Sequence, residues 1–165
     1  MEIEVSDYVN VEERSRFLGC NVPTSLAFLP RNFEKAESKK NLLHESSVAT
    51  IRILFRKNKI TETPLELEGE KFPQISEKGF VEWVGPIIFV SFAALSQDPN
   101  ILSLALGVIS NYLTDFFKGI PGIRNARLDI VVETKEKTYK KIHYEGPVSG
   151  LEKLPEVVNK AGFDD

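Results

Sequence analysis

A long and very apolar helix is the feature of this sequence that most constrains its fold. Asp98 can accept the free N–H groups of a first helical turn, and Pro99 suits the first position because the N–H it lacks is not needed there. Gly119 is typical of the residue that follows a helix end. We therefore predict a helix of about 20 residues, roughly 30 Å long, with Asp98 as its N-cap and its last turn near Lys118.

Apolar side chains occupy most of the surface of this predicted helix. A surface helix usually shows an apolar stripe only a little wider than about 100°. Here the polar positions are confined to a narrow stripe: Ser103, Ser110, Asn111, Thr114, Asp115 and Lys118. We expect Leu106 to be buried. One sheet face covers about one side of a helix. The other side of the helix therefore needs to be covered by residues 1–79, by a second subunit or by a membrane. Two copies of the chain could cover that other side together, and a two-fold dimer is the commonest such assembly. We therefore predict that the chain is not a simple monomer.

Length and charge distribution indicate one domain with two parts of different character. The 165 residues suit a single ordinary domain. Charges of both signs are scattered through residues 1–79, whereas residues 80–117 contain only Glu82, Asp98 and Asp115 and no basic residue. We predict one α+β domain over residues 1–165. In it, residues 1–79 form a mixed N-terminal part, and residues 80–162 form a strand, the long helix, a hairpin and a short C-terminal helix.

The C-terminal part is predicted as a β-α-β-β-α unit whose helix packs on a small, mainly antiparallel sheet. A short β-branched and aromatic run favours a buried strand, with an apolar helix as the alternative. Alternating residues then indicate two strands of a hairpin. A last helix is expected to end at Gly162. The predicted elements are a strand at Pro86–Phe92, a hairpin of Arg127–Glu133 with Tyr139–Glu145, and a helix at Pro155–Lys160.

The N-terminal part carries weaker signals. Two prolines bound a predicted strand at Thr24–Leu29, and Asn32 is a candidate cap for a short helix. Helical spacing of apolar residues from Val48 favours a helix over the alternative of a strand. The polar stretch Glu68–Gly79 is predicted as a loop, or as a short hairpin around Gly69.

Composition argues against several classes of binding partner and favours one cellular compartment. The formal net charge of −3 provides no general attraction to nucleic acid or to anionic membranes. The alternative is local: Lys137, Tyr139 and Lys141 would share one strand face of a basic hairpin. Cys20 is the single cysteine, which favours a reducing, cytoplasmic location. The uncharged stretches are shorter than the roughly 18 residues of a membrane span, although shallow insertion stays an alternative.

No catalytic, cofactor-binding or metal-ligating residue is predicted. Two isolated histidines and one cysteine lack the spacing of a metal site, and no nucleotide-binding or nucleophile motif occurs. His143 is expected on a solvated strand face with Lys141 and Glu145. His44 and Glu45 could form an acid–base pair, but the side chains of adjacent residues seldom point to the same reacting atom. The alternative is a small enzyme with a diffuse site built from Cys20, His44 or Asp115, which requires these residues to line one pocket.

The favoured hypothesis is a non-enzymatic protein-interaction or regulatory domain, which binds a protein or self-associates through residues 80–118. The wide apolar helix supports it, together with the lack of catalytic motifs. Peripheral membrane or nucleic-acid binding remains the other alternative. The sequence indicates no cofactor and no particular small-molecule ligand.

Overall fold

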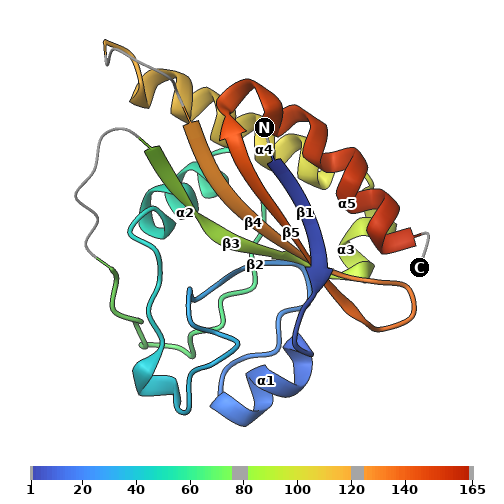
Figure 1. Cartoon of the computed structure of the whole chain (residues 1–165). Helices are drawn as coiled ribbons and strands as arrows, with labels where there is room; N and C mark the ends of the chain where they lie inside the picture. The colour runs from blue at the N-terminus through green and yellow to red at the C-terminus, as the bar shows by residue number, and fades with distance from the viewer. Residues whose placement is uncertain (1, 76–81, 120–124, 164–165) are drawn as a thin grey trace.

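A five-stranded mixed sheet forms the centre of the molecule, in the strand order β1-β5-β4-β3-β2 (Figure 1). The computed structural model describes residues 2–75, 82–119 and 125–163. Strands β3 and β4 are parallel, and the other neighbouring strands are antiparallel. The predicted α+β fold is therefore confirmed. The strands are β1 Glu2–Asp7, β2 Leu26–Leu29, β3 Glu82–Val90, β4 Asn125–Glu133 and β5 Tyr139–Pro147.

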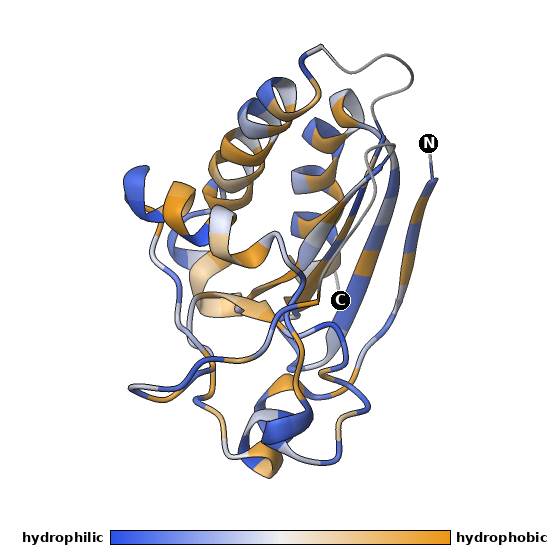
Figure 2. Cartoon of the chain, turned by 90° about the vertical axis from the view of Figure 1, so that its left-hand side faces the viewer, coloured by the Kyte–Doolittle hydropathy of each residue, from blue (hydrophilic) through white to orange (hydrophobic). Residues whose placement is uncertain are grey.

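Helices cover one face of this sheet along its length. Figure 2 shows most of the helices on one side, with β1 at the margin of the sheet next to the N label. The helices are α1 Val11–Leu18, α2 Val48–Lys57, α3 Phe92–Gln97, α4 Ile101–Phe116 and α5 Leu154–Phe163, and the short 3-10 helices are η1 Lys39–Asn41 and η2 Val148–Lys153. Of these, α2, α4 and α5 contribute to the core on this face, while α1 lies on the opposite side.

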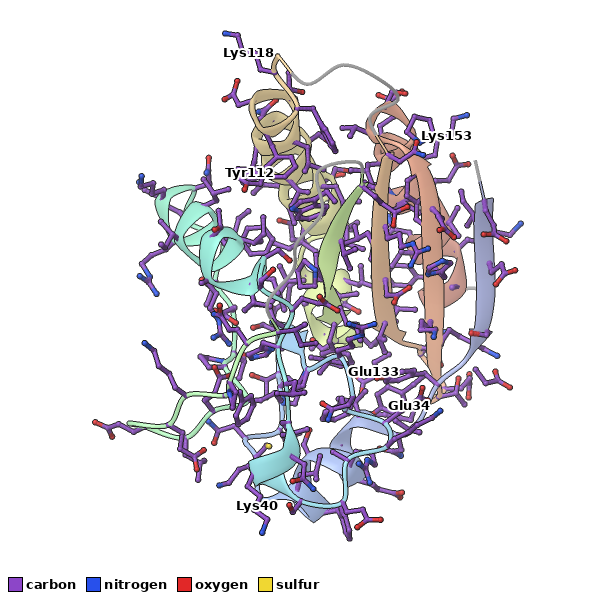
Figure 3. The ribbon with its side chains drawn as sticks, turned by 60° about the vertical axis from the view of Figure 1, so that its left-hand side comes forward. Glu34, Lys40, Tyr112, Lys118, Glu133 and Lys153 are labelled. Atoms are coloured by element: carbon purple, nitrogen blue, oxygen red, sulfur yellow. The ribbon has the colours of Figure 1, made fainter. Side chains whose placement is uncertain are left out.

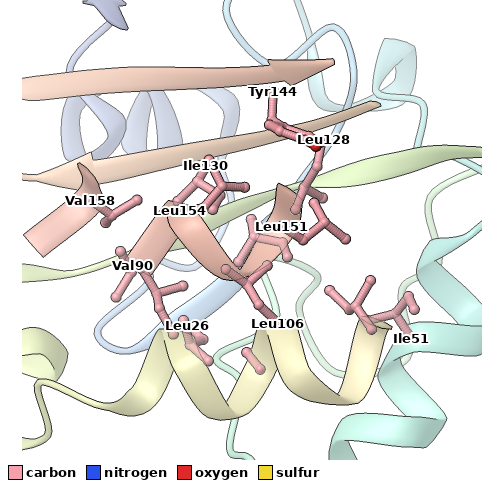
Figure 4. Close-up of a cluster of buried hydrophobic side chains, with 14 of the residues drawn as sticks. Leu26, Ile51, Val90, Leu106, Leu128, Ile130, Tyr144, Leu151, Leu154 and Val158 are labelled. Atoms are coloured by element: carbon pink, nitrogen blue, oxygen red, sulfur yellow. The ribbon is translucent and has the colours of Figure 1, made fainter. Parts of the chain in front are cut away.

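The first core lies between the sheet and α2, α4 and α5. Leu106 is 2% exposed in it, as predicted. Leu128 and Ile130 of β4 project into the same core (Figure 4). Val132 belongs to this core as well, which confirms the face predicted for the three residues. The packing of the sheet and helices in the C-terminal part thus buries the apolar side of α4.

A second core covers only one end of the opposite sheet face. Phe89 of β3 and Val131 of β4 meet Phe33, Leu42 and other residues of the 8–75 segment there. Two residues earlier in β4, Asp129 is half-buried, and Arg127 is exposed on the same face. The 8–75 segment therefore leaves the other end of this face open.

The start of α4 differs from the prediction. The helix begins at Ile101 and Asn100 is its N-cap position, whereas Asp98 is the C-cap of the short helix α3. Asp98 still accepts a main-chain N–H, that of Asn100, over 3.0 Å. Phe92 is not part of a strand, because Ser91 caps α3 by accepting the N–H of Ala94. Two helices therefore follow β3 where one was expected.

The last helix is longer than predicted. Gly162 does not end α5 but lies inside its last turn, where an added Cβ would come within 2.9 Å of Leu95 Cδ1. A larger residue there would require the Leu95 side chain of α3 to shift. Pro155 lies in the first turn of α5, where the N–H it lacks would have no partner in the helix.

Several expectations for the N-terminal part were wrong or incomplete. Residues 31–35 form a turn rather than a helix, and the Asn32 side chain joins it to the main chain of Leu43 and Asn41. The helix from Val48 is confirmed as α2, and the predicted strand at 24–29 is found as β2. Strand β1 and helix α1 were not predicted. Of the predicted loop, the turn at Gly69 is described, and residues 76–79 lie outside the described part of the chain.

Most of the wide apolar surface of α4 is covered within one chain. The sheet, α2, η2 and α5 surround it, and Leu104 is its most exposed apolar side chain at 49%. No contact in the structure tests self-association through residues 80–118, which stays a prediction. Among the described residues, no helix has the length and apolarity needed to cross a lipid bilayer.

We predict that Leu106→Ala lowers the free energy of unfolding by about 2–5 kcal/mol, because it leaves a cavity in the first core. Leu104→Ala is the matched control on the same helix and should change this free energy by only about 0.5 kcal/mol. Urea unfolding measures both. Similar losses for the two variants would contradict the packing described for α4.

Candidate functional site

Charged side chains gather on the open end of the second sheet face, which we call the charged face. Residues directly opposite one another in neighbouring strands project to the same side. The register places Glu4 beside His143 and His143 beside Asp129, with Glu2, Glu145 and Arg127 in the next row. Because of this register, strands β1, β5 and β4 all contribute to the face, and β3 adds to it. The charged face comprises Glu2, Glu4, Glu82, Arg127, Asp129, Lys141, His143 and Glu145.

A pocket of about 430 Å³ lies where the charged face meets the 8–75 segment. Its rim on that side consists of Tyr8, Arg31, Glu34 and Glu45. Glu34 is labelled beside the lower end of the sheet in Figure 3. Gly85 of β3 also lines the pocket, next to an irregularity in the β3–β4 pairing.

His143 is held between two carboxylates of the charged face. Its Nδ1 lies 2.6 Å from Asp129 Oδ1, and its Nε2 lies 3.5 Å from Glu145 Oε2. Burial lowers the pKa of His143, but the hydrogen bonds and negative charges of Asp129 and Glu145 outweigh burial and raise the pKa above its ordinary value. His143 lies on the predicted face with Lys141 and Glu145, but it is paired and only 27% exposed.

Arg127 connects the carboxylates on either side of it. Its Nε lies 2.7 Å from Glu145 Oε1 and 2.9 Å from Glu82 Oε1. Carboxylates outnumber basic side chains on the charged face and pocket rim: Glu2, Glu4, Glu34, Glu45, Glu82, Asp129 and Glu145 accompany Arg31, Arg127 and Lys141. The surface therefore suits a cationic ligand better than an anionic one.

His44 belongs to a different, buried cluster beside a pocket of about 830 Å³. It is 2% exposed, and its Nε2 lies 3.6 Å from Glu66 Oε2. Arg52 donates to both oxygens of Glu66 over 2.7 and 2.9 Å, and to Glu62 over 2.6 Å. Burial raises the pKa of Glu66, but the nearby His44 and the hydrogen bonds from Arg52 lower it to about 2. This cluster joins the loop after α2 to the helix itself and so supports the fold.

The residues of the predicted diffuse enzyme site do not come together. Cys20 is buried in the second core, where burial chiefly raises the pKa of its thiol to about 11. Asp115 is exposed on α4, and neither residue lines the pocket beside His44. A thiol with a raised pKa is a poor nucleophile, because the thiolate is the reactive form.

The basic strand face expected on the hairpin is not present as one exposed surface. Tyr139 is 5% exposed in the second core and donates to Glu133, so its ring is not presented for stacking. Lys137 lies in the turn of the hairpin with a positive φ of 65°, and Lys141 faces the pocket. The three residues do not form one exposed face.

The sequence patterns predict no site role for Glu2, Glu82 or Asp129. The alternating pattern of β4 and β5 did indicate that residues 127, 129, 143 and 145 point away from the first core. The pairing of Asp129 with His143 depends on the register between two strands, which no local pattern reports. Strand β1 carried no recognised signal at all.

Comparison with known proteins provides no further assignment. Neither a protein-family model, nor a curated protein sequence, nor a solved structure matches this chain.

We predict that Asp129→Asn lowers the pKa of His143 toward its ordinary value, because it removes the negative charge that favours the imidazolium. The raised pKa means that this pair stabilises the fold below about pH 6.5 and loses its effect as pH rises through the folded pKa. NMR titration of the two histidine rings measures the shift, and Asp115→Asn is the control. Identical His143 titrations in wild type and Asp129→Asn would contradict the pairing.

Proposed function

We propose that this chain is a non-enzymatic protein-interaction domain that binds an extended, basic segment of another protein along the outer edge of β1. The open edge of that strand is the observation on which the proposal rests. Among the described residues, β1 pairs with β5 on one side, and no strand pairs with its other side. Binding by strand addition needs such an edge, since main-chain hydrogen bonds supply much of the affinity.

The hydrogen-bond pattern indicates which main-chain groups are available. The N–H of Tyr8 donates to the carbonyl of Tyr139 over 2.9 Å, in the same register that places Glu2 opposite Glu145. Directly opposite residues of an antiparallel pair alternate between bonded and non-bonded pairs. Main-chain groups of Glu2, Glu4 and Ser6 therefore point toward β5, while those of Ile3, Val5 and Asp7 point away from the sheet.

The side chains around this edge favour a basic occupant. Glu2 and Glu4 lie on the charged face beside it, whereas Asp7 at the end of the strand is already paired with Lys140. All residues of β1 except the half-buried Ile3 are exposed, so no segment that the structure describes covers the outer edge of the strand. A second copy of β1 would bring like charges together, which destabilises cross-strand pairs. Lysine or arginine side chains on an added strand would instead meet these carboxylates.

Proteins usually protect open edges with prolines, bulges, lysines or a covering loop. The sequence of β1 contains neither proline nor lysine, and its pairing with β5 is regular. Its acidic side chains discourage pairing with itself while leaving the edge accessible to a basic segment. This combination supports recognition of another protein over uncontrolled self-pairing.

We predict that Val5→Pro weakens strand addition, because proline lacks the outward N–H while the bonds to β5 come from neighbouring residues. Val5→Ala keeps that N–H and is the matched control. The probe is a peptide of alternating lysine and valine, and an alternating glutamate and valine peptide tests charge. Amide NMR shifts of residues 3–7 report binding.

Wild type and Val5→Ala should bind the lysine peptide, with Val5→Pro weakened at least about tenfold. Equal binding of the lysine peptide to Val5→Pro would contradict strand addition. Equal binding of the two peptides to wild type would contradict a basic partner.

Self-association through residues 80–118 remains a separate proposal, supported by the exposure of Leu104. If it occurs, Leu104→Ser should reduce the mass seen by light scattering at micromolar concentration from two chains to one. Val5→Pro should leave that mass unchanged, because β1 lies at the edge of the sheet and is not part of residues 80–118. A wild-type mass of one chain would refute self-association without affecting the proposal for β1.

A further inference from the structure

We propose that Glu2, His143 and Glu145 form a binding site for a divalent transition-metal ion such as Zn²⁺. One ligand atom from each residue lies within 4.8 Å of the other two. A nitrogen and two carboxylate oxygens are ligands that zinc accepts, with water as a fourth. The inference does not depend on the proposed strand addition, because it uses side chains of the charged face rather than the main chain at the edge.

The orientation of His143 is the first argument. Asp129 Oδ1 lies 2.6 Å from Nδ1 and thereby fixes the plane of the ring. Nε2 is left on the side of Glu145, 3.5 Å from its Oε2. Metal-binding histidines commonly use their second nitrogen to donate to a carboxylate in this manner, which sets the tautomer and the direction of the lone pair.

The position of Glu145 is the second argument. Its Oε1 accepts from Arg127 Nε over 2.7 Å, which directs Oε2 toward His143. Bonds of about 2.0–2.2 Å in a tetrahedral zinc site place neighbouring ligand atoms roughly 3.4 Å apart. The His143–Glu145 separation already matches that distance. Glu2 lies opposite Glu145 on the edge strand and is exposed, so its side chain can turn to complete the site.

The charges around the site favour a cation. Glu2, Glu4 and Glu145 are close enough that the charge of Glu4, followed by burial and Glu145, raises the pKa of Glu2. A bound dication would relieve this repulsion between carboxylates. Arg127 and protonated His143 are the competing positive groups, and the metal must displace the proton of His143. Binding is therefore measured at pH 8, where more of the imidazole is neutral.

Zinc titration against a chromophoric chelator tests the site in the full chain. We expect one zinc ion per wild-type chain, and an affinity reduced at least about tenfold in His143→Ala and Glu145→Gln. Glu2→Gln, at an exposed position that keeps the fold, should weaken binding likewise. Glu12→Gln in α1 is the matched carboxylate control and should bind as wild type does.

Asp129→Asn separates a positioning role from general charge. It touches no metal, but it should weaken zinc affinity by about 10–100-fold because His143 is no longer held. The ¹⁵N shift of His143 Nε2 should change on zinc addition, while the His44 ring stays unchanged. Absence of zinc binding by wild type, or unchanged affinity in both His143→Ala and Glu2→Gln, would overturn the proposal.

Discussion

The parallel pairing of β3 with β4 is the contact on which the rest of the structure depends. Parallel neighbours need a crossover connection, and here α3 and α4 provide it on one face of the sheet. Ile88 and Ile130 on that face enter the first core, while Phe89 and Val131 enter the second. These two strands are buried on both faces only where the 8–75 segment covers them. Beyond that segment, β4 carries the polar side chains of Asp129 and Arg127 on its open face.

The charged face follows from this incomplete cover. Its side chains continue across β5 to β1 through the strand register, so the pocket, the His143 ion pairs and the open edge form one continuous surface. The helix face has a different role, because α4 buries most of its apolar side chains within the chain. A protein-binding role is accordingly better supported at the margin formed by β1 than along α4. The same surface also contains the three side chains proposed to bind zinc.

The sequence predicted the elements whose signals are local. The apolar face of α4, the alternation of the hairpin and the α2 helix are patterns within one segment, and each was recovered to within a few residues. Asp98 was misassigned because a second helix, capped by Ser91, precedes it. Strand β1 was missed because its acidic, exposed residues resemble a polar terminus until β5 is paired beside it. Likewise, Asp129, His143 and Glu2 are far apart in the sequence, and only the register between strands makes them one site.

Residue-resolved hydrogen exchange in β1 tests most directly whether its outer edge is open. Glu4 and Ser6 donate their amides to β5 in the register described, whereas Ile3 and Val5 direct theirs to solvent. We expect slow exchange at Glu4 and Ser6 and fast exchange at Ile3 and Val5 in the isolated chain. If the amides of Ile3 and Val5 were protected as strongly as those of Glu4 and Ser6, another strand would already occupy the edge. That result would contradict the proposed binding surface.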